Sequence, residues 1–307
     1  INNFFKTSRD RGLIDAINAT LQELKGVIFK AIGKRFIKRK IYNYEMLLDL
    51  NDNGISRALW LFGNRELEHK FMLEKVIKPG MSILDIGANI GYYPLMELKL
   101  IGNNGNLIAV EPSNTNISLL KQNLSLNNFR NIEIHQGAIS DTNSKKEIFI
   151  STQSNLNTFH NYGTGIDHLS GEKLEVKTFT ISKILNGRKA DLIRMDVEGH
   201  EVEILNGLVS NFKDMKKLPI IIFETHISRY SKSHDFSKTL QDIFHLGYEV
   251  VQVGSSSERG SEIIKSFGYH PIKSIKSDGV VRMIFEDINR KDAIKLICET
   301  GGIRTVL

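Results

Sequence analysis

Asp85 and the glycines that follow it form the strongest chemical signal in the sequence. Residues 83–91 read Ile-Leu-Asp-Ile-Gly-Ala-Asn-Ile-Gly, an apolar run that opens into a glycine turn. Such a turn lets a ligand approach the backbone and aims free helix N–H groups at it. The spacing of Gly87 and Gly91 is not the G-x-G-x-x-G of dinucleotide sites, and the Asp85 carboxylate would repel a pyrophosphate. The pattern favours a ligand with a cationic amino group, such as S-adenosylmethionine.

A second acid lies where an adenosine ligand would need it. Glu111 ends the next apolar run, 24 residues beyond Gly87, and an acid at about that interval can accept hydrogen bonds from both ribose hydroxyls. Ala138 and Ile139 end the third run, where small and apolar side chains would flank an adenine ring. Glu111, Ala138 and Ile139 indicate a cofactor site only because they follow the glycine turn in the sequence.

Four titratable side chains end two later apolar runs. Asp196 and Glu198 are two residues apart, which places both carboxylates on one side of an extended chain. Glu224 and His226 end the next run in the same way. Because open α/β folds bind ligands at the carboxyl ends of their strands, we expect these four groups to converge.

The elements that must position these residues begin near residue 81. Short runs of Ile, Leu and Val alternate with segments of helical periodicity, which predicts an α/β fold with a parallel sheet and crossover helices. Strands are expected at Ser82–Ile86, Leu107–Glu111, Ile132–Gln136, Leu192–Asp196, Ile220–Glu224, Tyr248–Val253 and Val280–Phe285. Helices are expected at Tyr92–Ile101, Thr115–Leu126, Glu201–Leu208 and Ser237–Leu246.

Two insertions interrupt this alternation. Residues 141–185 fit a hairpin, with strands at Glu147–Ser151 and Leu174–Phe179 and a polar loop that contains His160. Such an insertion could form a lid or a wall of the substrate site. Residues 254–279 are rich in serine and glycine and predict a second, mobile insertion.

The charge of the chain is concentrated at its beginning. The 307 residues carry a net charge of +6, but the first forty hold ten Lys and Arg against three Asp and Glu. This distribution excludes a basic nucleic-acid coat and predicts a near-neutral body with a basic arm. No apolar run approaches the roughly 18 residues of a membrane span. A single cysteine excludes an internal disulfide and fits a reducing compartment, and the opening Ile leaves room for an upstream segment.

The arm itself predicts an amphipathic helix. Residues 25–40 carry seven cations and no acid, with Ile28, Ile32 and Phe36 at four-residue spacing. A helix of this kind either packs on the main domain or lies on an anionic membrane or an acidic polymer. We therefore divide the chain into a basic helical extension, residues 1–45, and a main domain, residues 46–307.

The motifs and their order resemble the FkbM-type family of S-adenosylmethionine-dependent methyltransferases over roughly residues 52–226. The motifs that carry the likeness are Gly63-x-x-Glu66, Asp85-x-Gly-Ala-Asn-x-Gly-Tyr-Tyr, Glu111-Pro, Asp196-Val-Glu-Gly-x-Glu and Glu224-x-His. Two positions depart from the family pattern: Arg194 replaces a usual lysine, and Ser182 stands where an Asp is often found. The first change preserves charge, and the second removes an auxiliary polar contact.

The resemblance implies a class I methyltransferase fold. This is a Rossmann-like, mostly parallel sheet of seven strands with helices on both faces and an antiparallel last strand, here Val280–Phe285. The implied cofactor is S-adenosyl-L-methionine, with Asp85 and Glu66 at its methionine end and Glu111 at its ribose. The expected cofactor-binding residues are Glu66, Asp85, Gly87, Asn89, Gly91, Tyr92, Glu111, Ala138, Ile139 and Asp196.

An alcohol acceptor would need a group that removes its proton as the new bond forms. His226 is our first choice for this base, because unperturbed imidazole titrates at about 6.5. Asp196 and Glu198 are the alternatives, either as bases or, together with Glu224, as ligands of a divalent cation that acidifies the hydroxyl. His226 and Asp196 could instead have purely structural roles. His226 would then pair with Glu224, and Asp196 would cap a helix.

The resemblance thus implies O-methylation of a hydroxyl on a sugar, glycan or secondary metabolite. The expected partner is a small-molecule or glycan acceptor, with no nucleic acid and with membrane or acidic-polymer contact through residues 25–40. We expect a cytoplasmic location, peripheral to a membrane if that contact forms. The alternatives are a non-catalytic binding module with the same shell and an NAD-linked oxidoreductase, which the turn spacing disfavours. Acceptor identity, metal dependence and oligomeric state stay open.

Overall fold

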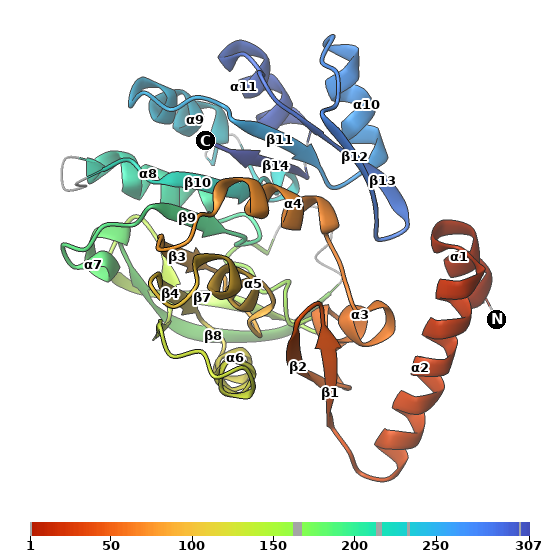
Figure 1. The fold of residues 1–307 in the computed structure, drawn as a ribbon. Coiled ribbons are helices and arrows are strands. Elements are labelled where there is room, and N and C mark those ends of the chain that lie inside the picture. Colours follow the sequence, from red (N-terminus) through yellow and green to blue (C-terminus); the bar gives the residue numbers. More distant parts are fainter. Residues whose placement is uncertain (1, 162–167, 213–216, 232–233, 301) are drawn as a thin grey trace.

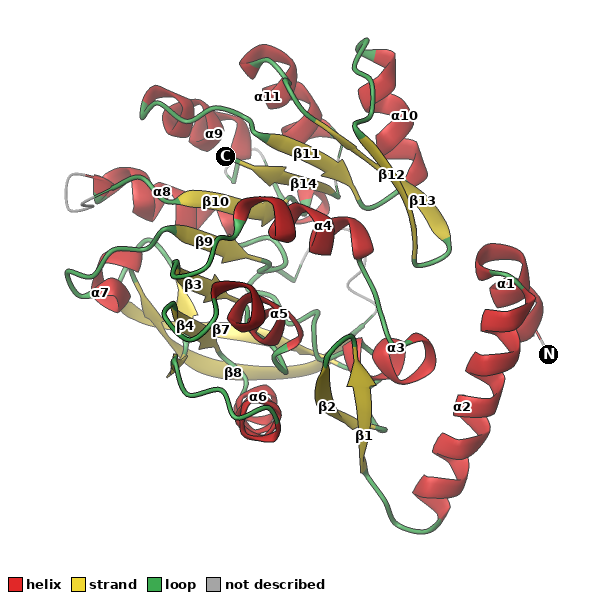
Figure 2. Cartoon of the chain, viewed as in Figure 1, coloured by secondary structure: helices red, strands yellow, loops and turns green. Residues whose placement is uncertain are grey.

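A computed structural model describes residues 2–161, 168–212, 217–231, 234–300 and 302–307 (Figures 1 and 2). The described elements are, in chain order, α1 (Asn2–Arg11), α2 (Leu13–Ala31), β1 (Phe36–Ile41), β2 (Tyr44–Asp49), α3 (Ile55–Phe62), α4 (Leu67–Val76), β3 (Ser82–Ile86), α5 (Tyr92–Ile101), β4 (Asn106–Glu111), α6 (Asn114–Leu126), β5 (Ile132–Gln136), β6 (Ala138–Ile139), β7 (Ser144–Ser151), β8 (Leu169–Phe179), α7 (Ile181–Leu185), β9 (Leu192–Met195), α8 (Glu201–Ser210), β10 (Ile220–Glu224), η2 (Ile227–Arg229), α9 (Phe236–His245), β11 (Gln252–Ser255), α10 (Glu258–Ser266), β12 (Lys273–Ser277), β13 (Val280–Phe285), α11 (Arg290–Glu299) and β14 (Ile303–Val306).

Nine strands of the described chain form one mixed sheet in the order β12-β13-β11-β14-β10-β9-β3-β4-β5. The strands from β5 to β10 pair in parallel, and those from β10 to β12 pair antiparallel. This is the predicted Rossmann-like α/β fold, with two strands more than the seven expected. The antiparallel strand beside β10 is β14, whereas Val280–Phe285 forms β13 nearer the edge. β14 reads Ile-Arg-Thr-Val, so the search for apolar runs missed it.

The parallel strands β3, β4, β9 and β10 are buried on both faces, which explains why they read as nearly continuous apolar runs, whereas the edge strand β5 is partly exposed. Along β3, Ile83 packs into the core on one face and Leu84 into the core on the other. Helices α3, α4, α5 and α6 contribute side chains to the first core, and helices α7, α8, α9, α10 and α11 contribute side chains to the second. The sheet edge that carries the predicted site lies between these two layers.

The insertion after β5 builds a second, three-stranded sheet in the order β6-β8-β7. β7 and β8 form the predicted hairpin, and both strands are longer than expected. β6 pairs in parallel with the end of β8 and so ties the hairpin to the main sheet. Part of the loop between the hairpin strands, residues 162–167, lies outside the described residues.

Residues 254–279 are not a loop insertion, because they contain helix α10 and strand β12. Ile264 of α10 is fully buried in the core, and β12 extends the sheet by pairing with β13. One of the serines that suggested a mobile insertion stabilises a helix instead. Ser257 caps α10 by accepting a hydrogen bond from the backbone N–H of Gly260 at 3.1 Å.

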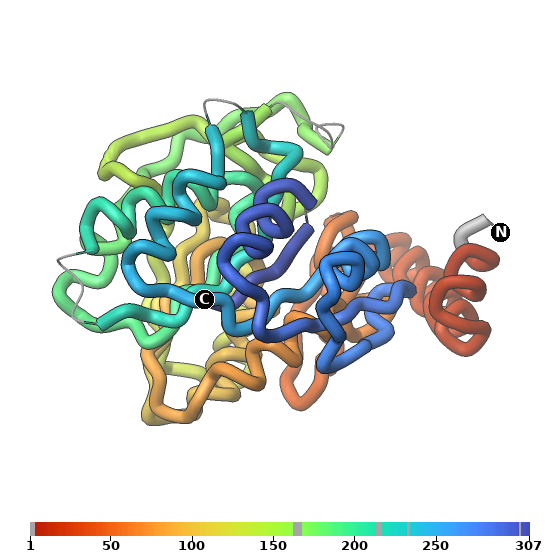
Figure 3. The backbone as a smooth tube through the Cα atoms, turned by 90° about the horizontal axis from the view of Figure 1, so that it is seen from above, coloured from red at the N-terminus to blue at the C-terminus, as the bar shows by residue number. Residues whose placement is uncertain are grey.

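The predicted helix over residues 25–40 is wrong beyond Ala31. Helix α2 ends there, Gly33 adopts a φ of +78°, and Phe36–Ile41 forms β1, which pairs antiparallel with β2. The boundary proposed at residue 45 therefore falls inside this hairpin. Helices α1 and α2 project from one side of the body (Figure 3). Within the described residues, no helix combines the length and the apolar character that a membrane span requires.

Candidate active site

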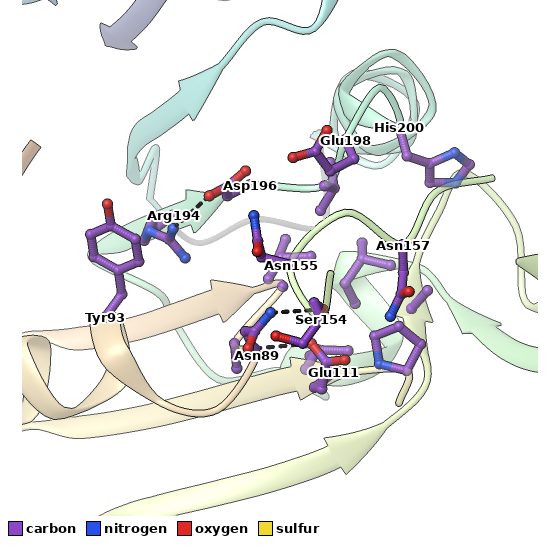
Figure 4. A pocket seen from close by; sticks show the side chains of 18 of the residues that line it. Asn89, Tyr93, Glu111, Ser154, Asn155, Asn157, Arg194, Asp196, Glu198 and His200 are labelled. Atoms are coloured by element: carbon purple, nitrogen blue, oxygen red, sulfur yellow. Dashed lines mark hydrogen bonds and ion pairs between the residues drawn. The ribbon is translucent and has the colours of Figure 1, made fainter. Parts of the chain in front are cut away.

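A cavity opens at the carboxyl ends of β3, β4 and β9, the edge where open α/β folds bind ligands (Figure 4). Its empty volume is about 830 Å³, including space open to solvent, which suits a nucleoside-sized ligand. The predicted cofactor residues that line it are Glu66, Gly87, Asn89, Tyr92, Glu111, Ala138, Ile139 and Asp196. Asp85, Gly91 and His226 are not part of its lining.

The glycine turn after β3 is wedged between two other elements. Gly87 has a φ of +83°, and a Cβ atom added to it would lie 2.3 Å from the carbonyl oxygen of Asp196. Gly91 has a φ of +97°, and a Cβ there would lie 2.7 Å from Cδ1 of Leu120 on α6. Only glycine satisfies both the dihedral angles and the close contacts at these positions. Gly91 therefore has a packing role, while Gly87 presents its backbone to the cavity.

Glu111 anchors the second side of the turn. Its Oε2 accepts a hydrogen bond from the backbone N–H of Asn89 at 2.9 Å, and its Oε1 accepts from Ser113 and Asn116, each at 3.0 Å. Burial raises the pKa of Glu111 to about 7, although these hydrogen bonds oppose the shift. These three hydrogen bonds leave one acceptor position, on Oε2, and Glu111 lines the cavity, so it can accept one hydrogen bond from a ligand such as a ribose.

Asp85 is buried behind the cavity, which corrects its predicted contact with the cofactor. Its Oδ1 accepts a hydrogen bond from Nη1 of Arg194 at 2.8 Å, and Arg194 Nη2 reaches Oδ2 of Asp196 at 3.2 Å. The guanidinium also stacks on Tyr93, 3.7 Å from the ring centroid. Asp85 thus positions Arg194, and Arg194 rather than Asp85 lines the cavity beside Asp196 (Figure 4).

Glu66, unlike Asp85, is an acid that lines the cavity. Its carboxylate pairs with Arg65 at 2.5 Å and with Arg304 of β14 at 3.0 Å, and it accepts the Tyr93 hydroxyl. Burial raises the pKa of Glu66, but Arg65 and Arg304 outweigh it and hold that pKa well below its ordinary value. An ionised carboxylate therefore faces the cavity at this end.

Asp196, Glu198 and His226 converge as predicted, with potential ligand atoms within 4.8 Å of one another. His226 Nε2 lies 3.6 Å from Glu198 and 4.0 Å from Asp196. Glu224 does not join this group in the way expected of a metal ligand. It pairs with Arg304 at 2.7 Å instead. The set that could hold a divalent cation is therefore two carboxylates and one imidazole.

His226 is held from behind by a buried carboxylate. Its Nδ1 lies 2.7 Å from Oε1 of Glu201, whose other oxygen accepts the Tyr230 hydroxyl at 2.8 Å. Burial lowers the pKa of His226, but Glu198 and Glu201 outweigh it and raise that pKa well above the ordinary value. A protonated imidazole outside the cavity is poorly placed to be the first base. The predicted pairing of His226 with Glu224 gives way to Glu201.

Glu198 has the properties expected of the base. It lines the cavity, and burial raises its pKa to about 7, although His226 opposes the shift. Its backbone has a φ of +51°, one of three left-handed non-glycine residues in the lining, together with Asn89 and Glu66. Such conformations persist only where the surroundings impose them, and they concentrate at functional sites.

The hairpin insertion covers the cavity. Its loop accepts a hydrogen bond at the Ser154 carbonyl from Asn89 Nδ2 at 3.0 Å, and Thr158 donates to the Glu198 carbonyl at 2.7 Å. Asn155 lies in the lining with a buried Oδ1 that has no hydrogen-bond partner (Figure 4). The sequence indicated a polar loop but gave no signal for Asn155, because its role depends on the fold of the hairpin.

The fold and the cavity define a class of enzyme, the S-adenosylmethionine-dependent methyltransferases. Residues 85–250, more than half of the chain, match the Methyltransferase FkbM domain. The chain belongs to the FkbM methyltransferase family. This membership removes the NAD-linked oxidoreductase from consideration. No curated protein matches the chain.

Solved methyltransferase structures resemble the chain at the level of the fold. Methyltransferase FkbM from Methylobacillus flagellatus KT is 14% identical, with 75% of this chain and 52% of that one covered and a TM-score of 0.36. TYW2 from M. jannaschii in complex with AdoMet is 15% identical, with 83% and 88% covered and a TM-score of 0.40. Precorrin-6y C5,15-methyltransferase from Geobacter metallireducens GS-15 is 16% identical, with 71% and 86% covered and a TM-score of 0.37.

The lining fits S-adenosylmethionine. Glu66 lines the cavity at the end expected to hold the methionine group, although Arg65 and Arg304 already pair with its carboxylate. Glu111 keeps one acceptor position, on Oε2, which suits a ribose hydroxyl. Gly87 lies in the lining of the cavity and carries no side chain there. Apolar walls at Ile139 suit an adenine.

Proposed function

We propose that this protein transfers a methyl group from S-adenosylmethionine to a hydroxyl oxygen of a sugar, glycan or secondary metabolite. The observation that carries the proposal is Glu198, a partly buried carboxylate with a pKa of about 7 that lines the cavity beside Asp196. An alcohol is too weakly acidic to lose its proton unaided, so a base with a pKa near the working pH suits an oxygen nucleophile.

Each of the residues at the cavity has its own role in this reaction. The bound cofactor supplies a methyl group that is already activated for displacement. Glu66 would contact the methionine end of the cofactor and Glu111 its ribose, and together they would fix its orientation, which is the main contribution to such a displacement. Glu198 accepts the proton of the acceptor hydroxyl, and the His226 imidazolium at 3.6 Å stabilises its carboxylate form. Arg194 balances the charge of Asp196, and the hairpin insertion excludes water.

A divalent cation is the second way in which the same residues could act. Asp196, Glu198 and His226 offer two oxygens and one nitrogen within 4.8 Å, a donor set that suits Mg²⁺ or Mn²⁺ less well than an all-oxygen site. Turnover that survives EDTA supports Glu198 as a simple base. Turnover that stops with EDTA and returns with Mg²⁺ assigns the three residues to metal binding.

The experiment that tests the proposal is methyl transfer from labelled S-adenosylmethionine to panels of hydroxylated sugars, amines and carboxylic acids. Labelled products with the hydroxylated acceptors alone support it. Transfer to amines alone would overturn the oxygen assignment. Calorimetry that detects S-adenosylhomocysteine binding with no turnover on any panel favours the non-catalytic binding module.

We also propose that helix α2 rests on an anionic membrane surface. Small residues of α2, among them Ala16, Ala19 and Gly26, face the body. The opposite face is apolar and exposed, with large side chains that are 46% to 75% accessible: Leu13, Ile14, Ile17, Leu21, Leu24, Val27 and Ile28. An exposed apolar band of this size on a surface helix marks an interaction site.

The positive charge near α2 favours an anionic lipid surface as the partner of this helix. The exposed lysines on and just after α2 are Lys25, Lys30, Lys34, Lys38 and Lys40. Of the two acids on α2, Glu23 pairs with Arg57 at 2.5 Å. Apolar side chains flanked by lysines suit the interface of an anionic bilayer, whereas an acidic polymer would leave the apolar band in water.

Sedimentation with phosphatidylcholine vesicles, with and without phosphatidylglycerol, tests this second proposal. Binding should require the anionic lipid, weaken with salt and be lost in Leu21→Glu/Ile28→Glu. Val251→Glu, which alters an apolar side chain of similar exposure elsewhere, should bind as the wild type does. A concentration-dependent dimer with no vesicle binding would instead place a second copy of the chain on α2.

A further inference from the structure

Three histidines and a glutamate meet behind one wall of the cavity, apart from Asp196 and Glu198. His160 comes from the loop of the hairpin insertion, His200 precedes α8, Glu203 lies in its first turn, and His234 follows η2. Potential ligand atoms of His160, Glu203 and His234 lie within 4.8 Å of one another. His200 Nδ1 lies 3.2 Å from Oε2 of Glu203. The proposed function does not use this cluster.

The hydrogen bonds around His200 leave one ring nitrogen, Nδ1, with a lone pair that faces the carboxylate of Glu203. Ser140 Oγ donates its only hydrogen to Asp141 at 3.0 Å and accepts from Lys146 at 2.9 Å. His200 Nε2, at 3.1 Å from the same oxygen, must therefore be the donor. Nδ1 has no hydrogen-bond partner, and the side chain is 3% exposed. With the ring hydrogen on Nε2, the Nδ1 lone pair lies 3.2 Å from Oε2 of Glu203.

His234 poses the same problem from the other side. Its Nδ1 lies 3.3 Å from the carbonyl oxygen of Arg229, and its Nε2 lies 3.0 Å from Oε2 of Glu203. Both neighbours are acceptors, but a neutral imidazole has a single N–H. Either the ring carries a second proton or a cation lies between Nε2 and the carboxylate. An Nδ1–H bonded to a backbone carbonyl is the usual way in which a metal-bound histidine is oriented.

We infer that His160, Glu203 and His234 bind a transition-metal ion of the zinc class, with His200 available as a fourth ligand. Imidazole and carboxylate are zinc ligands, with bonds of about 2.0–2.2 Å. In a tetrahedral site such bonds separate neighbouring ligand atoms by roughly 3.3 Å, close to the 3.0 Å and 3.2 Å found around Glu203 Oε2. An ion there resolves both acceptor conflicts.

The position of this site gives the ion a structural role. It would join the hairpin loop to α8 and to the segment after η2, which are distant in sequence. Phe159 and His200, which line the active-site cavity, stack on one another with ring centroids 4.2 Å apart. A metal bound to His160 and Glu203 would therefore fix the wall that closes over the acceptor.

Calorimetric titration of EDTA-treated protein with ZnCl2 tests the inference, with His226→Gln as the control for the other cluster. We expect one zinc per chain in the wild type and in H226Q. Affinity should fall at least tenfold in His234→Ala and in Glu203→Gln. Zinc should also raise the midpoint of thermal unfolding of the wild type and H226Q, but not of H234A.

Two results would overturn it. One is the absence of zinc binding to the wild type, and the other is binding that survives H234A and E203Q but is lost in H226Q. If circular dichroism shows that H234A is unfolded, His160→Gln replaces it with the same expected loss. Methyl transfer is not a readout here, so failure of the zinc site and failure of the proposed function are distinguishable.

Discussion

Gly87 lies so close to Asp196 that a Cβ atom on the glycine would come within 2.3 Å of the aspartate carbonyl oxygen. The cofactor turn and the end of β9 therefore touch through backbone alone. Any side chain at Gly87 must push the turn away from β9 and change the shape of the cavity.

Gly87→Ala should abolish S-adenosylhomocysteine binding by calorimetry and lower the free energy of unfolding by about 1–3 kcal/mol. Gly80→Ala is the matched control, since Gly80 shares the φ of +83° but has no atom within 4 Å of the added Cβ. It isolates the cost of the dihedral angle. If the two variants bind S-adenosylhomocysteine equally well and unfold alike, the close contact between Gly87 and Asp196 does not affect cofactor binding.

Arg194→Ala should be strongly destabilising. Its removal leaves Asp85 buried without a counter-charge, and breaking a buried pair from one side costs about 3–5 kcal/mol. Denaturant unfolding measures the loss, and Arg194→Lys should recover part of it. Arg188→Ala, which breaks an exposed pair with Glu133, should cost less than about 1 kcal/mol. A similar small cost for R194A would contradict the buried network.

The pH dependence of turnover should report Glu198. Because burial raises the pKa of Glu198 to about 7 and the base form is the deprotonated one, kcat/KM should rise with pH and level off above about 7. Glu198→Gln should remove this limb and lower kcat by about 10²–10⁴ while it keeps S-adenosylhomocysteine binding. If the limb persists in E198Q and disappears in His226→Gln, the imidazole is the base after all.

Thr158→Val tests whether the hairpin must dock on the catalytic loop. The variant keeps the shape of the side chain but loses two hydrogen bonds, the one donated to the Glu198 carbonyl and the one accepted from the backbone N–H of His160, each of which contributes about 1 kcal/mol. We expect a several-fold lower kcat/KM. Ser170→Ala removes an exposed hydrogen bond to Ile150 in the same hairpin and should leave kinetics unchanged. Identical kinetics in both variants would show that docking is dispensable.

The central parallel strands were predictable because burial on both faces gives a nearly continuous apolar run, whereas the edge strand β5 alternates apolar and polar residues. Strands β3, β5 and β10 begin and end where the sequence indicated. β14 was missed for the opposite reason, since Arg304 and Thr305 make it look polar. Arg304 is nevertheless buried, because Glu66 and Glu224 from other elements neutralise it.

The site was predictable to the level of motifs but not of contacts. Spacing placed Asp196, Glu198 and His226 at one edge, and they meet there. Spacing could not reveal that Asp85 would pair with Arg194, 109 residues away, or that Glu201 would hydrogen-bond to His226. Those partners depend on which face of each strand a side chain occupies once the sheet has formed.

The position of β14 has a consequence for how the protein is made. Of the described strands, β14 emerges from the ribosome after all the others, yet it lies between β10 and β11 in the sheet. Its Arg304 pairs with Glu66, which lines the cavity. A nascent chain can therefore stack its parallel strands early but acquires a competent cofactor site only when this strand has been translated and inserted.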